Sequence, residues 1–434
     1  MSGVGMANAM NESLSENQRE VFGAAGEGGE PRQIGMGAGP AALLAVLFVG
    51  YLAYAADRLV FNTLLAPIQK SLGLNGVQVG LLGSAIYVGV LCTVLLAGHL
   101  SDRYGRWRII IAGLALFTAF TWLIGFSTSF EEALLFRLIS GMGEGLFWPV
   151  AMAAVAARYG ARKGLALGVF YTGFDVGGII GAAVTGAVFY IAAAWQPAFF
   201  VAPTIGLVAI AGVLAGRKGL EWSGKDSSML ALGRDALAVL RRRGVVVILA
   251  FATFATWATV WQTVFLAYYY RSVLNLPVVY SALAYIPVPA AGIVGKVLLG
   301  GLSDRWRRDR LLLLASLGMV ASYAVFFGSS DLAVDVAASL SMGFFSSALF
   351  PVMQSLATDR SGGRVGTALG LTTTFQSVAT ILAPFTTGAM FFIGVGTAVA
   401  LEAMVPAVLT LVSAALLKDP RLEVGQALEG TKGF

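Results

Sequence analysis

The chain has 434 residues, of which 57% are hydrophobic and 12% are charged, and its formal net charge is +6. A soluble domain carries about twice that share of charged residues, so the surplus apolar surface must face lipid and a soluble globular protein is excluded. The single Cys92 excludes an internal disulfide, and the single His99 excludes a histidine-based metal cluster. We expect Cys92 to be a small buried apolar residue, and we expect no metal and no cofactor.

The predicted elements begin after a polar N-terminal stretch. Residues 1–40 are rich in Gly, Glu and Ser and lack the pattern of a signal peptide, so they are predicted to be a disordered cytoplasmic tail. Apolar runs of about 20 residues, the length that spans a bilayer, follow in two sets of six. The first set is predicted near 41–67, 77–99, 108–128, 132–157, 164–191 and 197–216. The second set is predicted near 245–270, 278–302, 310–328, 332–357, 364–392 and 396–417. The predicted domains are therefore an N-terminal bundle (41–216), a linker (217–244), a C-terminal bundle (245–417) and a cytoplasmic tail (418–434).

The basic residues between the spans predict the orientation of the chain. If the N-terminus is cytoplasmic, the loops on the outer side contain only Lys70 and Arg271, and the other loop arginines and lysines are on the inner side. This asymmetry indicates a multi-pass protein of the plasma (inner) membrane with both termini in the cytoplasm. The basic loop residues thus orient the chain in the membrane, and the net positive charge does not indicate binding of nucleic acid. Within the linker, 227–243 has apolar residues at helical spacing and arginines near one end, which predicts an interfacial helix.

Two loops nearly repeat each other, GHLSDRYGRWR at 98–108 and GGLSDRWRRDR at 300–310. Gly98 and Gly300 are 202 residues apart in the chain. The same offset relates three downstream pairs: Pro149 with Pro351, GLALG (164–168) with GTALG (366–370), and TGA (185–187) with TGA (387–389). A constant offset predicts two parallel six-helix repeats with a substrate site between them, near the middle of the membrane.

The first of these loops resembles the signature between the second and third spans of the major facilitator superfamily, and the second loop resembles its degenerate copy. The resemblance covers the whole membrane part and implies an all-α membrane protein with twelve transmembrane helices in two six-helix repeats. It also implies a cytoplasmic gate formed by Gly98, Asp102, Arg103, Gly105, Arg106, Asp304 and Arg305. In that family Asp102 and Arg103 would form contacts that break when the bundles rock. A purely orienting role for the loop charges would not explain Asp102 or the glycines.

Ionisable residues inside the predicted spans are distributed unequally between the repeats. Five of them, each replaced by Thr, Val or Ser at the position 202 residues later, are Asp57, Arg58, Arg137, Glu144 and Asp175. Lys296 in the eighth span corresponds to Val94 in the first repeat. Each such charge costs at least roughly 2.5–3.5 kcal/mol at the centre of a bilayer, and one repeat folds without them. We therefore expect them to serve function.

The first span presents Tyr54, Arg58 and Asn62 on one helical face, whereas Asp57 is about 100° away on the helix. Each charge of the adjacent pair should therefore face a different partner. A guanidinium matches a carboxylate, so Arg58 is predicted to bind an anionic substrate. Glu144 and Asp57, together with Arg137, are predicted to couple transport to protons, because a carboxylate in a desolvated site is a suitable proton carrier. Static ion pairs with the two arginines are the alternative.

Further substrate contacts are predicted for Tyr171, Asp175, Trp261, Lys296 and Gln376. Lys296 either supplies a second positive contact from the C-terminal bundle or extends to the membrane interface. For Trp261, packing between helices is the alternative to a ligand contact.

Two segments resemble the organic-anion (anion–cation symporter) branch of the superfamily: YAADRLVFNTLLAPIQKSLGL (54–74) its first span, and RLISGMGEGLFWP (137–149) its fourth. That branch often has a tyrosine where this chain has Val90, and here Tyr87 lies earlier. The resemblance implies that Arg58 contacts the substrate carboxylate and that Asp57 and Glu144 take part in proton coupling. We expect a proton-coupled secondary transporter of a small organic anion, not an enzyme, that works by alternating access as a monomer in the lipid bilayer. The alternatives are a spinster-like lysolipid or sphingolipid transporter, a drug–proton antiporter and a non-transporting sensor.

Overall fold

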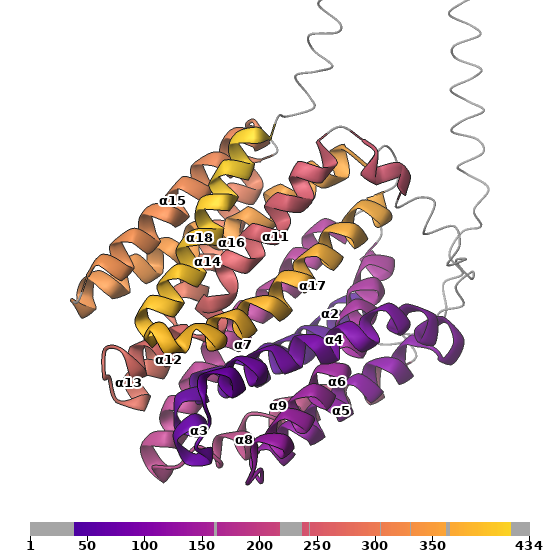
Figure 1. Ribbon diagram of the computed structural model, residues 1–434. Helices are drawn as coiled ribbons and strands as arrows, with labels where there is room; N and C mark the ends of the chain where they lie inside the picture. The colour runs from indigo at the N-terminus through magenta and orange to yellow at the C-terminus, as the bar shows by residue number, and fades with distance from the viewer. Residues whose placement is uncertain are drawn as a thin grey trace, which may run out of the picture. The chain divides into compact units, whose positions relative to one another are not determined.

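The computed structural model describes residues 39–159, 163–217, 237–242, 244–303, 305–329, 331–361 and 365–417 (Figure 1). Within these residues, twelve helical segments are long and apolar enough to cross a membrane. The fold class is confirmed: the described chain is helical, without strands, and its spans form two sets of six. Most of the predicted tails and of the interfacial helix, as well as Asp304, lie outside the described residues.

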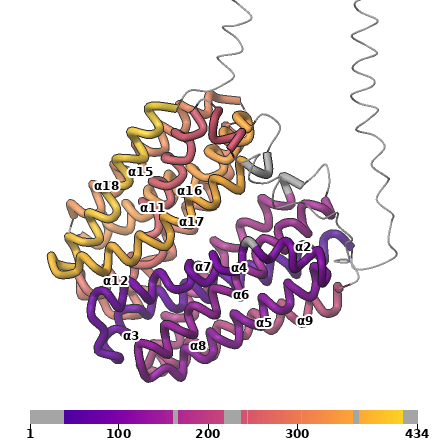
Figure 2. The backbone as a smooth tube through the Cα atoms, turned by 45° about the vertical axis from the view of Figure 1, so that its right-hand side comes forward, coloured from indigo at the N-terminus to yellow at the C-terminus, as the bar shows by residue number. Residues whose placement is uncertain are grey.

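The first half of the chain contributes six spans, which lie next to one another in Figure 2. Its helices are α2 (Pro40–Thr63), α3 (Leu65–Leu72), α4 (Gly76–Tyr104), α5 (Arg106–Ile124), α6 (Phe130–Tyr159), α7 (Lys163–Ala192), α8 (Ala198–Val201) and α9 (Thr204–Gly216). α4 begins with a capping box, in which Asn75 and Gln78 each accept a hydrogen bond from the other's backbone N–H. The turn from α4 to α5 is made by Gly105, whose φ of +91° favours glycine.

The second half repeats this pattern. Its helices are α11 (Val245–Val264), α12 (Leu266–Ser272), α13 (Val278–Leu283), α14 (Pro287–Leu302), α15 (Arg308–Gly328), α16 (Leu332–Asp359), α17 (Val365–Ala389), η3 (Met390–Ile393) and α18 (Val395–Leu416). The first span of each half is interrupted near the same position, at Leu64 and at Phe265. The fourth span of each half contains an internal proline, Pro149 or Pro351.

A pair of repeat-related glycines permits close helix packing inside each half. A Cβ atom on Gly141 of α6 would lie 2.1 Å from the carbonyl oxygen of Ile86 in α4. A Cβ atom on Gly343 of α16 would lie 2.2 Å from the carbonyl oxygen of Val288 in α14. Only glycine permits such an approach of two backbones, so the same residue at the same place in both repeats positions the fourth span against the second.

The two halves touch on the side of the membrane opposite to the beginning of α2 and the end of α18, which we call the termini side. There, a Cβ atom on Gly388 of α17 would lie 2.4 Å from the carbonyl oxygen of Gly76, and one on Gly80 of α4 would lie 2.6 Å from that of Pro384. The Ser84 hydroxyl donates to the carbonyl oxygen of Ile381 at 2.7 Å. Nearer the termini side, the same and neighbouring helices contain glycines with open space around them, namely Gly98, Gly168, Gly301 and Gly370. The halves are therefore closed against each other on the side opposite to the termini.

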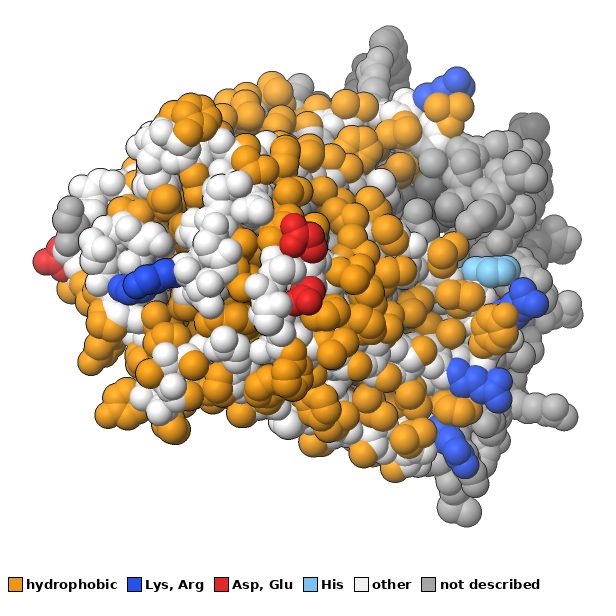
Figure 3. Space-filling model, turned by 60° about the horizontal axis from the view of Figure 1, so that its bottom comes forward, with side chains coloured by type: hydrophobic (Ala, Val, Ile, Leu, Met, Phe, Trp, Pro, Cys, Tyr) orange, Lys and Arg blue, Asp and Glu red, His pale blue; other side chains and the backbone are white. Residues whose placement is uncertain are grey.

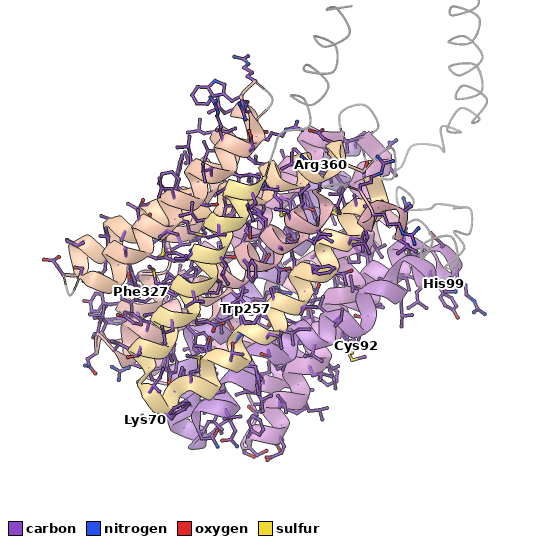
Figure 4. The ribbon with its side chains drawn as sticks, turned by 45° about the horizontal axis from the view of Figure 1, so that its top comes forward. Lys70, Cys92, His99, Trp257, Phe327 and Arg360 are labelled. Carbon is purple, nitrogen blue, oxygen red and sulfur yellow. The ribbon has the colours of Figure 1, made fainter. Side chains whose placement is uncertain are left out.

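The surface agrees with a membrane protein. Hydrophobic side chains cover most of the face in Figure 3, and Lys and Arg side chains gather at the edge beside His99, the pale blue side chain. Cys92 is exposed on α4, and in Figure 4 it lies at the outer edge of the molecule. The expectation that Cys92 is buried was wrong, because this part of α4 faces away from the helices that cover its other side.

Candidate functional site

A buried ion pair joins the first and fourth spans of the first half. Arg58 of α2 donates from Nε and Nη2 to a single oxygen, Oε2 of Glu144 in α6, at 2.8 and 2.6 Å. Glu144 is 0% and Arg58 8% exposed. Oε1 of Glu144 has no hydrogen-bond partner. The pair thus uses only part of the hydrogen-bonding capacity of both groups.

Two tyrosine rings enclose the guanidinium of Arg58. Its central carbon lies 4.4 Å from the ring centroid of Tyr54 in α2 and 4.9 Å from that of Tyr87 in α4. Aromatic faces attract a cation and shield it from water. Arg58 is therefore fixed in position by three helices, α2, α4 and α6.

Asp57, next in the chain to Arg58, faces different partners, as its angular position on the helix predicted. The hydroxyls of Thr121 in α5 and Ser140 in α6 donate to its two carboxylate oxygens. Nη1 of Arg137 lies 3.9 Å from Oδ2 of Asp57. The adjacent charges of α2 thus enter two separate ion pairs, both with residues of α6.

Arg137 is fully buried and connects the site to the second half. Its guanidinium lies over the ring of Phe61 at 4.1 Å, and its Nη2 donates to Oδ1 of Asn62 at 3.2 Å. Nδ2 of Asn62 in turn donates to the carbonyl oxygen of Thr263 in α11 at 3.0 Å. A chain of hydrogen bonds therefore runs from a buried arginine of the first half to the backbone of the second.

A further ion pair crosses between the halves directly. Nζ of Lys296 in α14 donates to Oδ1 and Oδ2 of Asp175 in α7, at 2.9 and 2.8 Å. The Asp175 side chain is 5% exposed and that of Lys296 is 28% exposed. Lys296 thus meets an anion of the opposite half in this conformation, and it is not a lone side chain extended to the interface.

Aromatic side chains from α2 and α7 lie between these two ion pairs. Tyr51 stacks on Tyr54 and Phe170, with ring centroids 5.2 and 4.5 Å apart, and also contacts Tyr171 and Phe174. The Tyr171 hydroxyl donates to the sulfur of Met152 at 2.9 Å. This aromatic cluster is suited to an apolar or ring-bearing part of a ligand whose charge lies at Arg58.

Two other predicted contacts have different outcomes. The expectation for Trp261 was wrong, because its ring is 0% exposed and packs against Tyr323, Phe326 and Phe327 inside the second half. The alternative of helix packing fits this residue. Gln376 of α17 is half-buried, and its role stays a prediction.

The predicted gate residues lie at the termini side. Gly98, Asp102 and Arg103 are exposed at the end of α4, and the guanidinium of Arg103 lies 5.3 Å from the centroid of the Tyr104 ring. Arg106 begins α5 beside Asp102, and Arg305 is exposed in the corresponding loop of the second half. Because the halves meet on the opposite side, their gating role stays a prediction.

Reasoning from the sequence missed several partners in the site. Thr121 and Ser140 carry no signal on their own, although Ser140 lies between Arg137 and Glu144 on the same helix. Tyr87 was noted only as a departure from a family pattern, yet its ring contacts Arg58. Comparison of the repeats also overlooked Glu402, a buried carboxyl group of the second half.

Among the described residues, no group of His, Cys, Asp and Glu is arranged to hold a metal ion.

Comparison with known proteins identifies the family. The model of the Major Facilitator Superfamily matches residues 47–384 and 290–432. The chain belongs to the Major Facilitator Superfamily. It is therefore a multi-pass membrane protein of a family of transporters and not of a family of enzymes, as the sequence predicted.

Curated relatives in this superfamily include carriers of organic acids. A 3-(3-hydroxy-phenyl)propionate transporter of Escherichia coli (strain K12) is 27% identical over 354 residues, which cover 79% of this chain and 85% of the relative. A probable sulfoacetate transporter of Cupriavidus necator is 26% identical over 376 residues, covering 80% and 86%. A probable 4-methylmuconolactone transporter of Cupriavidus pinatubonensis is 33% identical over 195 residues, covering 44% of each chain.

Solved structures share the fold. A bacterial homolog of the human lysosomal transporter Spinster, in an inward-facing and occupied conformation, superposes with a TM-score of 0.69 at 19% identity, covering 87% of this chain and 96% of the other. The D-xylose-proton symporter superposes with a TM-score of 0.67 at 14% identity, covering 85% and 96%.

Proposed function

We propose that the protein is a secondary transporter that moves a small organic anion together with a proton by alternating access. Arg58 binds the substrate carboxylate, and Glu144, with Asp57 and Arg137 beside it, takes up and releases the proton. The observation that supports this assignment best is the arrangement of Arg58 and Glu144, in which two donors of the guanidinium share one oxygen of the carboxylate.

This arrangement suggests how the two ligands depend on each other. When Glu144 is ionised, its negative charge occupies Arg58 and competes with a substrate anion. When Glu144 takes up a proton, its attraction for Arg58 falls, and the fork of N–H donors is released for an external carboxylate. A proton and a monovalent anion carried together add no net charge to the site, so the loaded carrier avoids burying an uncompensated charge.

The substrate class is supported by the relatives and by the site. Three curated relatives carry names of organic-acid or lactone transporters, and this chain offers Arg58 beside an aromatic cluster of α2 and α7. We propose a small organic acid whose carboxylate meets Arg58 and whose hydrophobic part lies against Tyr51 and Tyr54. A polar group at the other end of such a molecule would reach Asp175 and Lys296.

The loop charges support the proposed orientation in the membrane. Lys70 and Arg271 lie opposite to the termini side, whereas the arginines of the α4–α5 turn and those preceding α15 lie on it. By the positive-inside rule, we place the termini in the cytoplasm of a cell whose plasma (inner) membrane holds the protein. The domain limits predicted from the sequence and a monomeric state are part of the same proposal.

Uptake by purified full-length protein in liposomes tests this function. With the inside of the vesicles alkaline, we expect accumulation of 3-(3-hydroxyphenyl)propionate or of another small carboxylate, and no accumulation without the gradient. Arg58→Ala should abolish uptake, whereas Arg271→Ala, which removes an arginine of α12 on the side opposite to the termini, should not. Uptake of a lysolipid but of no carboxylate, or uptake that ignores the pH gradient, would refute the proposal.

A further inference from the structure

Glu402 is a buried carboxyl group of the second half that has no part in the site described above. It lies in α18, about 10 Å from the end of this helix opposite to the termini side, at 1.5 Å per residue. Its exposed fraction is 6%. An ionisable residue at this depth in a membrane span is costly, and such residues are normally paired with another group or have a function.

Two side chains of neighbouring helices contact Glu402. Nε1 of Trp257 in α11 donates to Oε1 of Glu402, and Trp257 is labelled in Figure 4. Oγ1 of Thr386 in α17 lies 3.2 Å from both Oε1 and Oε2. The three residues thus connect α11, α17 and α18.

The single hydrogen of the Thr386 hydroxyl favours one protonation state of Glu402. A threonine hydroxyl has one hydrogen to donate. Oγ1 of Thr386 lies 3.0 Å from the carbonyl oxygen of Leu382 and 3.1 Å from that of Ala383, closer than to either oxygen of Glu402. If its hydrogen points to these backbone oxygens, the hydrogen between Thr386 and Glu402 must belong to the carboxyl group.

The charges around Glu402 favour the same state. Within their bounds, α11, α17 and α18 contain no other Asp, Glu, Lys or Arg. Three further helices pack against α18, and none of them places a charge at Glu402. The helix η3 contains no charged residue. Arg271 of α12 donates to the carbonyl oxygen of Leu276, and Arg308, Asp309 and Arg310 begin α15 at its termini-side end. The other titratable groups of α12 and α15 are the hydroxyls of Tyr268, Tyr269, Tyr270 and Tyr323.

An ionised carboxylate in this place would have no counter-charge among the described residues. Burial of such a charge without a counter-charge is strongly unfavourable, whereas a neutral acid with satisfied hydrogen bonds avoids this cost. In the first half, by contrast, Glu144 and Asp57 each face an arginine.

We infer that Glu402 is a second proton-binding site, located in the second half, which holds its proton in this conformation. Its Oε2–H donates to Oγ1 of Thr386, while its Oε1 accepts from Nε1 of Trp257. The site is separate from Arg58 and Glu144, and the inference does not depend on the proposed transport function.

The bound proton also lies close to the contact between α17 and α4, where the two halves are closed. Thr386 is two residues from both Pro384 and Gly388, about 200° around α17 from the face that touches α4. The carboxyl hydrogen therefore connects one face of α17 to α18, while the opposite face of α17 packs against α4 of the first half.

Infrared spectroscopy of the full-length protein in lipid bilayers tests this inference. A protonated carboxyl group has a carbonyl band distinct from the bands of a carboxylate. In a Glu144→Gln background at neutral pH, Glu402→Gln should remove one such band, whereas Glu131→Gln, which alters an exposed acid of α6, should remove none. If Glu402→Gln removes no protonated band, Glu402 is ionised and the inference is wrong.

A second variant gives a readout that does not require removal of the acid. Trp257→Phe deletes the donor to the carbonyl oxygen, and loss of that hydrogen bond should shift the band to higher frequency. An unshifted band in Trp257→Phe would overturn the assignment.

Discussion

Lys296 of α14 and Asp175 of α7 form an ion pair that crosses from one half of the transporter to the other, with both carboxylate oxygens within 2.9 Å of the ammonium nitrogen. The Asp175 end of the pair is buried and the Lys296 end is partly exposed. The pair therefore stabilises the relative position of the two halves in this structure. If the protein works by the proposed alternating access, the pair must break when the halves move.

Removal of one partner of this pair should lower stability and uptake more than removal of both partners. Lys296→Met leaves the buried Asp175 without a counter-charge, and we expect a lower melting temperature and slower uptake. The double variant Lys296→Met/Asp175→Asn should recover part of both, with a coupling energy of roughly 0.5–3 kcal/mol in thermal unfolding. Additive effects of the two substitutions would show that the pair makes no contribution.

Arg58→Lys should impair transport although it retains the positive charge. A lysine offers a point charge in place of a planar fork and cannot keep the paired donation from Nε and Nη2 to Glu144. If one such hydrogen bond is worth about 1.4 kcal/mol at the transition state, initial uptake should fall about tenfold. Arg271→Lys is the matched control, and equal uptake by the two variants would contradict a specific role for the guanidinium.

Arg137→Met should destabilise the fold more than it affects substrate recognition. Arg137 is fully buried, and its removal leaves Asp57 without its nearest cation and Asn62 without a donor. Breaking a buried pair costs roughly 3–5 kcal/mol, which thermal unfolding in detergent should detect. A variant that unfolds like the wild type would show that the Arg137–Asp57 pair does not stabilise the fold.

Gly388→Ala should weaken the closed side. An added Cβ would lie 2.4 Å from the carbonyl oxygen of Gly76, so α4 and α17 must move apart. We expect a cysteine introduced at Ser84 to react faster with a membrane-impermeant thiol reagent in this variant, in a chain whose Cys92 is replaced by Ala. Gly370→Ala of the same helix meets nothing within 4 Å and is the control. Equal reaction rates in both variants would contradict the tight contact.

Much of the fold follows from the sequence because its signals are long and repeated. Apolar runs of membrane-spanning length and the constant offset between GHLSDRYGRWR and GGLSDRWRRDR predict twelve spans in two sets of six, and this prediction is confirmed. The separate partners of Asp57 and Arg58 also follow from the sequence, because adjacent residues point about 100° apart on a helix.

Other features of the site depend on packing that no local pattern encodes. The ring of Trp261 was expected at the substrate site, but an apolar aromatic residue fits a helix interface equally well, and tertiary packing against Tyr323 decides its place. The pairing of Lys296 with Asp175 depends on how one half lies against the other. Glu402 was overlooked because it is a single acidic residue in an apolar span, with no charged residue near it in the sequence to suggest a site.

The most direct measurement of the central proposal compares exchange with accumulation in Glu144→Gln. An amide cannot take up and release a proton, but it leaves Arg58 free to bind an anion. We therefore expect Glu144→Gln in liposomes to exchange internal for external substrate at a rate near that of the wild type, and to lose accumulation driven by a pH gradient. Full gradient-driven accumulation in this variant would show that Glu144 does not carry the coupled proton.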